Sequence, residues 1–575
     1  ENSQAGVSVD LTQGIAFDGF GGTDTLRNIE HVNGSMFDDT LVGDGNGNWF
    51  RPASGNDFVD GRGGLDVVMY ESAPGGVHVH LQAGCPSGAD IGNDQLVSIE
   101  AVHGSLYDDQ VQLSNTTGGY VFGRAGNDQL RGGTGNDNLI GGLGNDFLDG
   151  GAGNDTASYF EDGFEGPGGH GVVVDLQAGT ATDNWGFTDT LVNIESVTGS
   201  EFADRMTGSV RNDSLIGNGG DDQLFGGAGS DFFIGGAGND FIDGGAITDL
   251  INYNDLNTVS YQSSTSGIVA NLQTGRVEDG LGGVDTLVNI NWFNGSAFND
   301  RITGSSANWF EQFDGGAGDD IIDGGAIDPV TFANANRLTL FNSGSAATVD
   351  FTAGTADSRL GHDTLININH VVATRFADTL LGSDSQIPES FAGRGGNDFI
   401  DGKGGLDEVR YNFGNGPVNV NLATGVAIDG EGGTDTLAHN EGVRGSNGND
   451  TLTGGNAASD ALEFFMGLAG NDLIDGGRGY HPVGYQTPTT GVRATLGGTS
   501  AGTAADGFGG TDTLLNIEAV RGSNFNDVLT GSDSGAFESF EGREGNDSID
   551  GKGGVDRAGY ASSIAGVTVN LGAGT

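Results

Sequence analysis

The chain is 575 residues long and strongly acidic, with 79 aspartate and glutamate residues against 22 lysine and arginine residues and a formal net charge of −57. This balance argues against nucleic acid and anionic membranes as partners, because both are negatively charged. The sequence contains no run of about 18 apolar residues, the length needed to span a bilayer. The single cysteine, Cys85, excludes an internal disulfide framework. Because the bare chain would repel itself, the composition predicts bound cations.

Short strands are predicted from the beginning of the chain onward. Residues 7–11 and the equivalent segments 172–176, 418–422 and 567–571 alternate between apolar and polar side chains or run apolar for about five residues. No window shows a sustained helical period with caps, and 110 glycines would interrupt one. The predicted fold is therefore all-β.

Four nine-residue repeats stand in tandem at residues 123–158, each a glycine turn followed by one carboxylate and one apolar residue. Glycine permits positive φ and lets backbone carbonyls approach a cation closely, and aspartate supplies a hard oxygen ligand for calcium. Stacked copies would share ions between turns, which predicts a calcium-bound parallel β-roll, a form of β-solenoid. The aspartates of this run and of a second one are Asp128, Asp137, Asp146 and Asp155, and Asp222, Asp231, Asp240 and Asp249.

The GGxGxDxUx pattern of residues 123–158 resembles the RTX, or haemolysin-type, calcium-binding repeat. Two blocks of four in strict nine-residue phase make the resemblance specific. It implies calcium as the cofactor and a secreted protein.

Larger copies of one phrase, GVxVxL followed by DGxGGTDTLxNIExVxGSxFxDxLxG, organise the rest of the chain into repeat units of about 80 residues. Their predicted boundaries are 1–73, 74–160, 161–261, 262–333, 334–411, 412–485 and 486–560, with the start of an eighth unit at 561–575.

Further metal ligands are predicted inside these units. The TDT segment places carboxylates at Asp24, Asp94, Asp189, Asp285, Asp363, Asp435 and Asp512, and shorter nonapeptide runs place them at Asp57, Asp66, Asp320, Asp398, Asp407, Asp472, Asp547 and Asp556. In a degenerate repeat, phenylalanine replaces a glycine two residues before Asp39. Asp39 and its equivalents are therefore either ligands or caps of turns. The equivalents are Asp109, Asp204, Asp300, Asp378, Asp450 and Asp527.

Two other recurring residues are interpreted as structural. The glutamate of the NIE segment, Glu195 for example, becomes asparagine at Asn291 and Asn369, which favours a solvent-facing or hydrogen-bonding role over an essential ligand. Aromatic residues that close the nonapeptide blocks are expected to form a ladder in the core. They are Tyr70, Tyr159, Tyr253, Phe332, Tyr411, Tyr485 and Tyr560.

The sequence offers no catalytic motif: it contains no HExxH helix, no GxSxG elbow and no Walker loop. We therefore expect no enzyme within these residues. Three functions compete: a calcium-stabilised array in an extracellular filament, surface layer or adhesin stalk; the secretion and folding region of a type I exported enzyme; and a calcium store. The first is favoured, because an exported enzyme usually needs only one compact block.

The two ends of the chain stand at nearly the same phase of the repeat and show no polar capping element. We expect this to be a stretch of a longer protein, located outside the cell or at its surface. The expected partners are further copies of the chain, in fibres or an array, and cell-surface polysaccharide.

Overall fold

The computed structural model describes residues 3–82, 87–88, 91–114, 118–160, 169–248, 255–307, 309–327, 335–414, 416–455, 462–563 and 566–569. All elements assigned in these residues are β-strands, which confirms the all-β prediction. The chain forms two compact units, one reaching Phe293 and the other continuing from Asn294. No helix in the described residues is long and apolar enough to cross a membrane.

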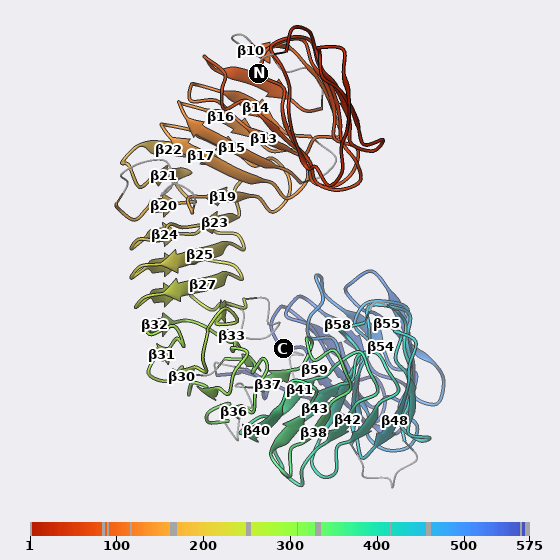
Figure 1. The fold of residues 1–575 in the computed structure, drawn as a ribbon. Helices are drawn as coiled ribbons and strands as arrows, with labels where there is room; N and C mark the ends of the chain where they lie inside the picture. Colours follow the sequence, from red (N-terminus) through yellow and green to blue (C-terminus); the bar gives the residue numbers. More distant parts are fainter. Residues whose placement is uncertain are drawn as a thin grey trace. The chain divides into compact units, whose positions relative to one another are not determined.

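Each unit is a β-solenoid whose strands alternate between two parallel sheets, here called sheet I and sheet II (Figure 1). One turn consists of two nonapeptides, so strands that pair with each other stand two repeats apart in the sequence. In sheet I, Val121 pairs with Leu139, and in sheet II, Leu130 pairs with Leu148. Leu130, Leu139 and Leu148 are fully buried, as expected for the apolar residue of each repeat. The β-roll predicted from the nine-residue phase is confirmed.

Among the described residues, eleven strands of sheet I lie wholly within the first unit. They are β4 (His31–Asn33), β6 (Trp49–Arg51), β8 (Val67–Met69), β13 (Ala101–His103), β15 (Tyr120–Ala125), β17 (Asn138–Leu143), β19 (Thr156–Ser158), β23 (Ser196–Thr198), β25 (Ser214–Gly219), β27 (Phe232–Ala237) and β29 (Thr258–Ser260). The opposite face carries β5 (Thr40–Val42), β7 (Phe58–Asp60), β12 (Gln95–Val97), β14 (Gln110–Gln112), β16 (Gln129–Arg131), β18 (Phe147–Asp149), β24 (Arg205–Thr207), β26 (Gln223–Phe225) and β28 (Phe241–Asp243).

The second unit repeats this plan. Its sheet I strands are β35 (Glu311–Asp314), β37 (Asn336–Thr339), β41 (His370–Val372), β43 (Ser390–Ala392), β45 (Glu408–Arg410), β49 (Gly442–Arg444), β51 (Phe464–Met466), β53 (Pro482–Gly484), β57 (Ala519–Arg521), β59 (Phe537–Glu541) and β61 (Val555–Ala558). Its sheet II strands are β34 (Arg301–Thr303), β36 (Ile321–Asp323), β42 (Thr379–Leu381), β44 (Phe399–Asp401), β50 (Thr451–Thr453), β52 (Leu473–Asp475), β58 (Val528–Thr530) and β60 (Ser548–Asp550).

A three-stranded antiparallel meander interrupts sheet II near the start of each large repeat. In the meander of β20 (Val173–Asp175), β21 (Thr180–Thr182) and β22 (Thr188–Val192), the chain moves forward and then folds back, because β22 pairs with the earlier β18 and β20 with the later β24. Sheet I has no such insertion: β19 pairs directly with β23.

The remaining meanders have the same order. They are β1 (Ser8–Asp10), β2 (Ile15–Phe17) and β3 (Thr23–Thr25); β9 (Val77–His80), β10 (Ser87–Gly88) and β11 (Gly92–Asn93); β30 (Val269–Asn271), β31 (Arg276–Glu278) and β32 (Val284–Val288); β38 (Thr348–Asp350), β39 (Thr355–Asp357) and β40 (His362–Ile366); β46 (Asn419–Asn421), β47 (Val426–Ile428) and β48 (Thr434–Ala438); and β54 (Arg493–Thr495), β55 (Gly502–Ala505) and β56 (Thr511–Leu515).

The block-closing aromatics are partly as predicted. Four of the expected tyrosines are buried: Tyr70, Tyr159, Tyr411 and Tyr485. Tyr253 and Phe332 lie outside the described residues, and the positions assigned to them belong to Tyr261 and Leu340, which are buried. Tyr560 was predicted to be a core residue, and this is wrong: it is 47% exposed, because β61 beside it has a neighbour on one side only among the described strands.

Candidate metal sites

A ladder of aspartates follows sheet II, each placed directly before a strand or, for the TDT aspartates such as Asp189, at its second residue. The Asp109 N–H donates to Asp128 Oδ1 at 2.7 Å, the Asp128 N–H donates to Asp146 Oδ1 at 2.8 Å, and the Asp146 N–H donates to Asp189 Oδ1 at 2.9 Å. Each carboxylate therefore binds the backbone of the preceding turn. We call this series the sheet II ladder, and it also contains Asp39, Asp57, Asp94, Asp204, Asp222, Asp240, Asp285, Asp300, Asp320, Asp363, Asp378, Asp398, Asp435, Asp450, Asp472, Asp512, Asp527 and Asp547.

A second ladder precedes the strands of sheet I. The Gly119 N–H donates to Asp137 Oδ1 at 2.7 Å, the Asp137 N–H to Asp155 Oδ1 at 2.8 Å, and the Asp155 N–H to Glu195 Oε2 at 3.2 Å. This sheet I ladder is mixed in composition. It also contains Asp66, Asp231 and Asp407, and neutral or basic residues at Asn257, Asn336 and His481.

The glycines hold the turns close enough for these contacts. A Cβ on Gly141 would lie 2.3 Å from Asp146 Oδ2, so only glycine leaves room for the carboxylate. Gly142 has φ +91°, and a Cβ there would lie 2.0 Å from the Arg124 carbonyl oxygen one turn earlier. Glycine is thus required both for conformation and for the close approach of successive turns.

One oxygen of many ladder aspartates is buried with no hydrogen-bond partner. These atoms are Oδ2 of Asp57, Asp66, Asp128, Asp146, Asp155, Asp222, Asp231, Asp240, Asp320, Asp398, Asp407 and Asp472. Asp128 shows what surrounds such an atom: a Cβ on Gly123 would lie 2.4 Å from Asp128 Oδ2 and 2.6 Å from the Gly141 carbonyl oxygen. Two acceptors therefore meet with no donor between them, an arrangement that a cation satisfies.

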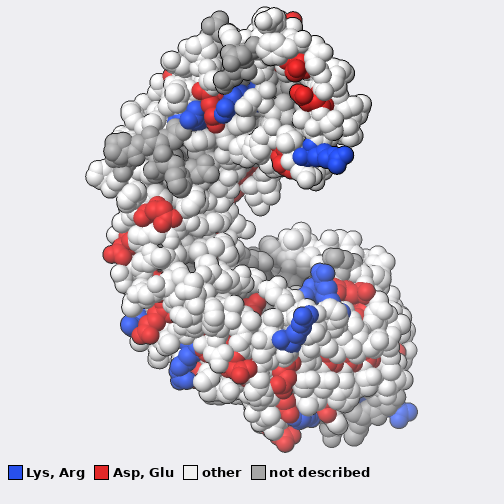
Figure 2. Space-filling view, viewed as in Figure 1, with Lys and Arg blue, Asp and Glu red and all other residues white. Residues whose placement is uncertain are grey.

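Burial of so many carboxylates raises their pKa values. Burial raises the pKa of Asp128 to about 8, although the hydrogen bond from the Asp109 N–H opposes the shift. Burial, with the charge of Asp189 as the next cause, raises the pKa of Asp146 to about 9. A divalent cation would remove this electrostatic cost. On the face shown in Figure 2, acidic side chains form scattered groups and one narrow row across the lower right of the view, and most ladder aspartates are buried.

The degenerate repeats are capped turns. Asp109 Oδ2 accepts from the Ser105 N–H at 2.6 Å, and Asp109 Oδ1 accepts from Ser105 Oγ at 2.8 Å and from the Val77 N–H at 2.7 Å. Asp39 has the same contacts with Ser35 and Val7. Both oxygens are satisfied by the chain, so the geometry favours the capping alternative for Asp39 over the metal role.

The TDT aspartates mark the ends of ladder segments. Tyr159 Oη donates to Asp189 Oδ2 at 3.1 Å, so this carboxylate also has partners on both oxygens. The same tyrosine contact occurs at Asp94, Asp285, Asp435 and Asp512. At Asp363 the position of the tyrosine is taken by Leu340, which has no hydroxyl group to donate.

Four predicted ligands differ from the others in position. Asp24 and Asp556 are exposed and Asp547 is half-buried, because β3, β60 and β61 stand at edges of the described sheets. Asp249 lies outside the described residues. The ladder position predicted for it, two nonapeptides after Asp231, is instead occupied by Asn257, whose Oδ1 accepts from the Asp231 N–H at 3.2 Å.

Sequence reasoning missed a further set of buried carboxylates, the aspartates of the DG step in the large repeat. Asp279 Oδ1 accepts from three backbone N–H groups, of Leu281, Gly282 and Gly283, and its Oδ2 is buried without a partner. The recurrence of DG in the repeat phrase could have revealed them. The other members are Asp429 and Asp506, together with Asp183, which asparagine follows in place of glycine.

A basic residue stands at one position of the sheet I ladder. His481 is fully buried, with Nδ1 3.2 Å from Glu518 Oε2 and Nε2 3.4 Å from Glu463 Oε2. Burial lowers the pKa of His481, but the two glutamates outweigh it and raise the pKa to about 9.

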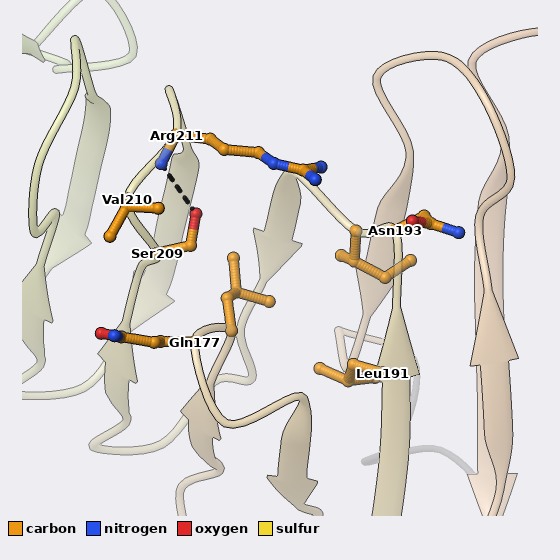
Figure 3. A pocket seen from close by; sticks show the side chains of 8 residues that line it. Gln177, Leu191, Asn193, Ser209, Val210 and Arg211 are labelled. Atoms are coloured by element: carbon orange, nitrogen blue, oxygen red, sulfur yellow. Dashed lines mark hydrogen bonds between the residues drawn. The ribbon is translucent and has the colours of Figure 1, made fainter.

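A half-open recess of about 230 Å³ lies beside the β20–β22 meander. Figure 3 shows Gln177, Leu191, Asn193 and Arg211 around it, with the Arg211 N–H donating to Ser209 Oγ at 3.0 Å. The Arg211 guanidinium is 3.4 Å from Glu195. Arg211 is thus engaged in contacts within the fold.

Rows of buried carboxylates that meet backbone carbonyls define a metal-binding parallel β-roll. Among the described residues, no three acidic, histidine or cysteine side chains converge on one point, so a calcium ion here would need further oxygen ligands, for which the adjacent backbone carbonyls are placed. The family model of the RTX calcium-binding nonapeptide repeat matches residues 122–157, 198–233, 229–253, 289–308, 311–326, 440–458, 461–480 and 537–558. The chain carries RTX calcium-binding nonapeptide repeats across much of its length, which confirms the predicted resemblance. No curated protein matches the sequence.

Proposed function

We propose that the chain is a secreted structural array, folded by calcium outside the cell and assembled into a filament, a surface layer or an adhesin stalk. The observation that carries the proposal is the recurrence of unpartnered carboxylate oxygens along both compact units. A fold that needs a cation at turn after turn forms only where calcium is plentiful. Extracellular calcium modules bind at roughly 10⁻⁴ to 10⁻³ M, so the sites would be empty in the cytosol and filled outside.

The proposal assigns these residues no catalytic role. The described strands all belong to the solenoid or to the meanders inserted in it, and the aspartates before them hold the backbone of neighbouring turns. Repetition of this kind suits an extended object more than a folding aid for one enzyme domain. Calcium would also neutralise much of the formal charge of −57 and so permit copies to associate.

The first unit offers a surface for a polysaccharide partner. His31 and Trp49 have ring centroids 5.2 Å apart, Trp49 and His103 5.5 Å, and His103 and Tyr120 5.6 Å. Trp49 is 37% exposed. Of these rings, those of Trp49 and His31 are exposed and can contact a sugar face, and Trp49→Ala should weaken binding to isolated surface polysaccharide.

Two measurements test the proposal. Circular dichroism should show a largely disordered chain in chelator and a β-rich chain in millimolar calcium, reversibly, because ligands that bind only the folded state stabilise it. Electron microscopy in millimolar calcium should show fibres or sheets that dissolve in chelator. A spectrum indifferent to calcium contradicts the calcium role. Folded, dispersed monomers would instead favour the secretion and folding region of a type I exported enzyme.

A further inference from the structure

Six pairs of sheet I ladder residues span the meanders, and in each the backbone N–H of the first residue donates to a side-chain oxygen of the second. We call them junction pairs. Three are acidic: Asp66–Glu100 at 3.0 Å, Asp155–Glu195 at 3.2 Å and Asp407–Glu441 at 3.1 Å. Two are amides, Asn257–Asn291 at 2.7 Å and Asn336–Asn369 at 2.9 Å. The last is His481–Glu518 at 3.0 Å.

The two members of a pair change together. Wherever the first residue is aspartate the second is glutamate, and wherever the first is asparagine so is the second. The pair therefore carries either two negative charges or none. In the sixth, the imidazole of His481 faces the glutamate. The asparagines at 291 and 369 are thus not evidence that Glu195 is dispensable, because their partners have changed as well.

Each acidic pair contains one buried carboxylate oxygen without a hydrogen-bond partner. Asp66, Asp155 and Asp407 are fully buried, and Oδ2 of each has no partner. A Cβ on Gly150 would lie 2.5 Å from Asp155 Oδ2 and 2.3 Å from the Asn193 carbonyl oxygen. The orphan oxygen therefore stands beside a carbonyl oxygen of a residue in the left-handed conformation, φ +50° for Asn193.

The amide pairs show what fills this place when no charge is present. Asn257 Nδ2 donates to the Asn289 carbonyl oxygen at 3.2 Å, and Asn336 Nδ2 donates to the Asn367 carbonyl oxygen at 2.9 Å. These carbonyls correspond to that of Asn193. An amide N–H thus occupies the position at which the acidic pair has an unpartnered oxygen facing an acceptor.

We propose that the junction pairs are of two kinds: the three Asp–Glu pairs each hold one divalent cation through Asp Oδ2, the glutamate and the adjacent carbonyl, and the three others close without a cation. Calcium fits the acidic kind, because it accepts carboxylate and carbonyl oxygens together. This makes Glu100, Glu195 and Glu441 ligands in addition to the aspartates of the nonapeptides. In the other pairs the asparagine amide, or the His481 ring, replaces the ion. The inference rests on the proposed calcium role.

Exchanging the two kinds of pair tests this, with native mass spectrometry of the full chain in calcium to count bound ions. Asp155→Asn with Glu195→Asn copies the natural amide pair and should lower the count by one while the chain remains folded by circular dichroism. Asn257→Asp with Asn291→Glu should raise it by one. Asp407→Asn with Glu441→Asn repeats the loss in the second unit.

Unchanged counts in the folded variants would overturn the inference. So would failure of the amide-converted variants to fold in saturating calcium, since the structure shows that an amide pair suffices at this position. A wild-type chain that binds no calcium would instead refute the proposed function itself, so the two failures are distinguishable.

Discussion

The backbone N–H of Asp137 donates to Oδ1 of Asp155, one solenoid turn later, at 2.8 Å. Each aspartate in such a ladder is an acceptor for the previous turn and a donor to the next. Folding of one turn therefore prepares the next, and loss of one carboxylate leaves a buried donor behind.

Replacing Asp137 by alanine should raise the calcium concentration needed for folding. Asp137 accepts from the Gly119 N–H at 2.7 Å and from the Gly133 N–H at 2.6 Å, and an unsatisfied buried donor costs about 1–3 kcal/mol. The calcium midpoint, followed by circular dichroism, checks this. Asp24→Ala is the matched control, because Asp24 is exposed, and equal shifts in the two variants would show that the buried contacts of Asp137 do not stabilise the fold.

The calcium-free chain should be more stable in mild acid than in alkali. The pKa values of Asp128, Asp222 and Asp146 rise from 3.8 to about 8, 8 and 9, with burial as the main cause. The folded state then binds protons more tightly than the unfolded state, so this stabilisation is complete below about pH 4 and is lost progressively as pH rises from about 4 to about 8 or 9.

Circular dichroism in chelator at pH 5.5 and pH 9 measures this effect. Folded structure should be greater at pH 5.5, and Asp146→Asn should reduce the difference, because the amide does not titrate. Greater stability at pH 9 than at pH 5.5 would show that burial of the carboxylates does not control the pH dependence of folding.

Gly142→Ala should be strongly destabilising even in saturating calcium. Its added Cβ would meet the Arg124 carbonyl oxygen at 2.0 Å, in a residue with φ +91°. Gly186 has nearly the same φ, +90°, with no atom within 4 Å of an added Cβ, so Gly186→Ala measures the conformational cost alone, roughly 1–2 kcal/mol. Comparable melting temperatures for the two variants would refute the close approach of turns.

Tyr159→Phe should destabilise the fold by about 1–3 kcal/mol, because it removes the donor to the buried Asp189 Oδ2. Chemical denaturation in millimolar calcium provides the measurement. Tyr560→Phe, at an exposed tyrosine, should leave stability unchanged; a null result for Tyr159→Phe would mean that the hydroxyl contributes packing only.

Local spacing predicted the solenoid well and its interruptions poorly. Nine residues, the spacing of the aspartates from Asp128 to Asp155, form half a turn of the solenoid. The strands, the inward-facing leucines and the stacked carboxylates therefore follow from this spacing. The ladder step from Asp231 to Asn257 is longer than two nonapeptides, and a fixed period therefore pointed to Asp249 and Tyr253 in place of Asn257 and Tyr261. The meander order could not be predicted, because β20 and β22 have similar apolar patterns and only pairing distinguishes their neighbours.

Which carboxylates lack a partner was also beyond the sequence. Asp39 and Asp57 look alike in spacing, yet Asp39 accepts from Ser35, four residues earlier, whereas Asp57 has Ala53 at that place and its Oδ2 has no partner. Hydrogen-bond satisfaction depends on atoms brought together by stacking, which a repeat pattern does not contain.

The two-nonapeptide turn also limits how the gene can change length. Adding or deleting a pair of nonapeptides restores both ladders, with every aspartate again above its predecessor. Adding or deleting a single nonapeptide, which is half a turn, would transfer each downstream carboxylate to the opposite sheet. The strands on the two sides of the changed site would then no longer continue the same two sheets. Viable length variants should therefore differ by whole turns, and engineered shortening should remove residues 128–145 as one block, not half of it.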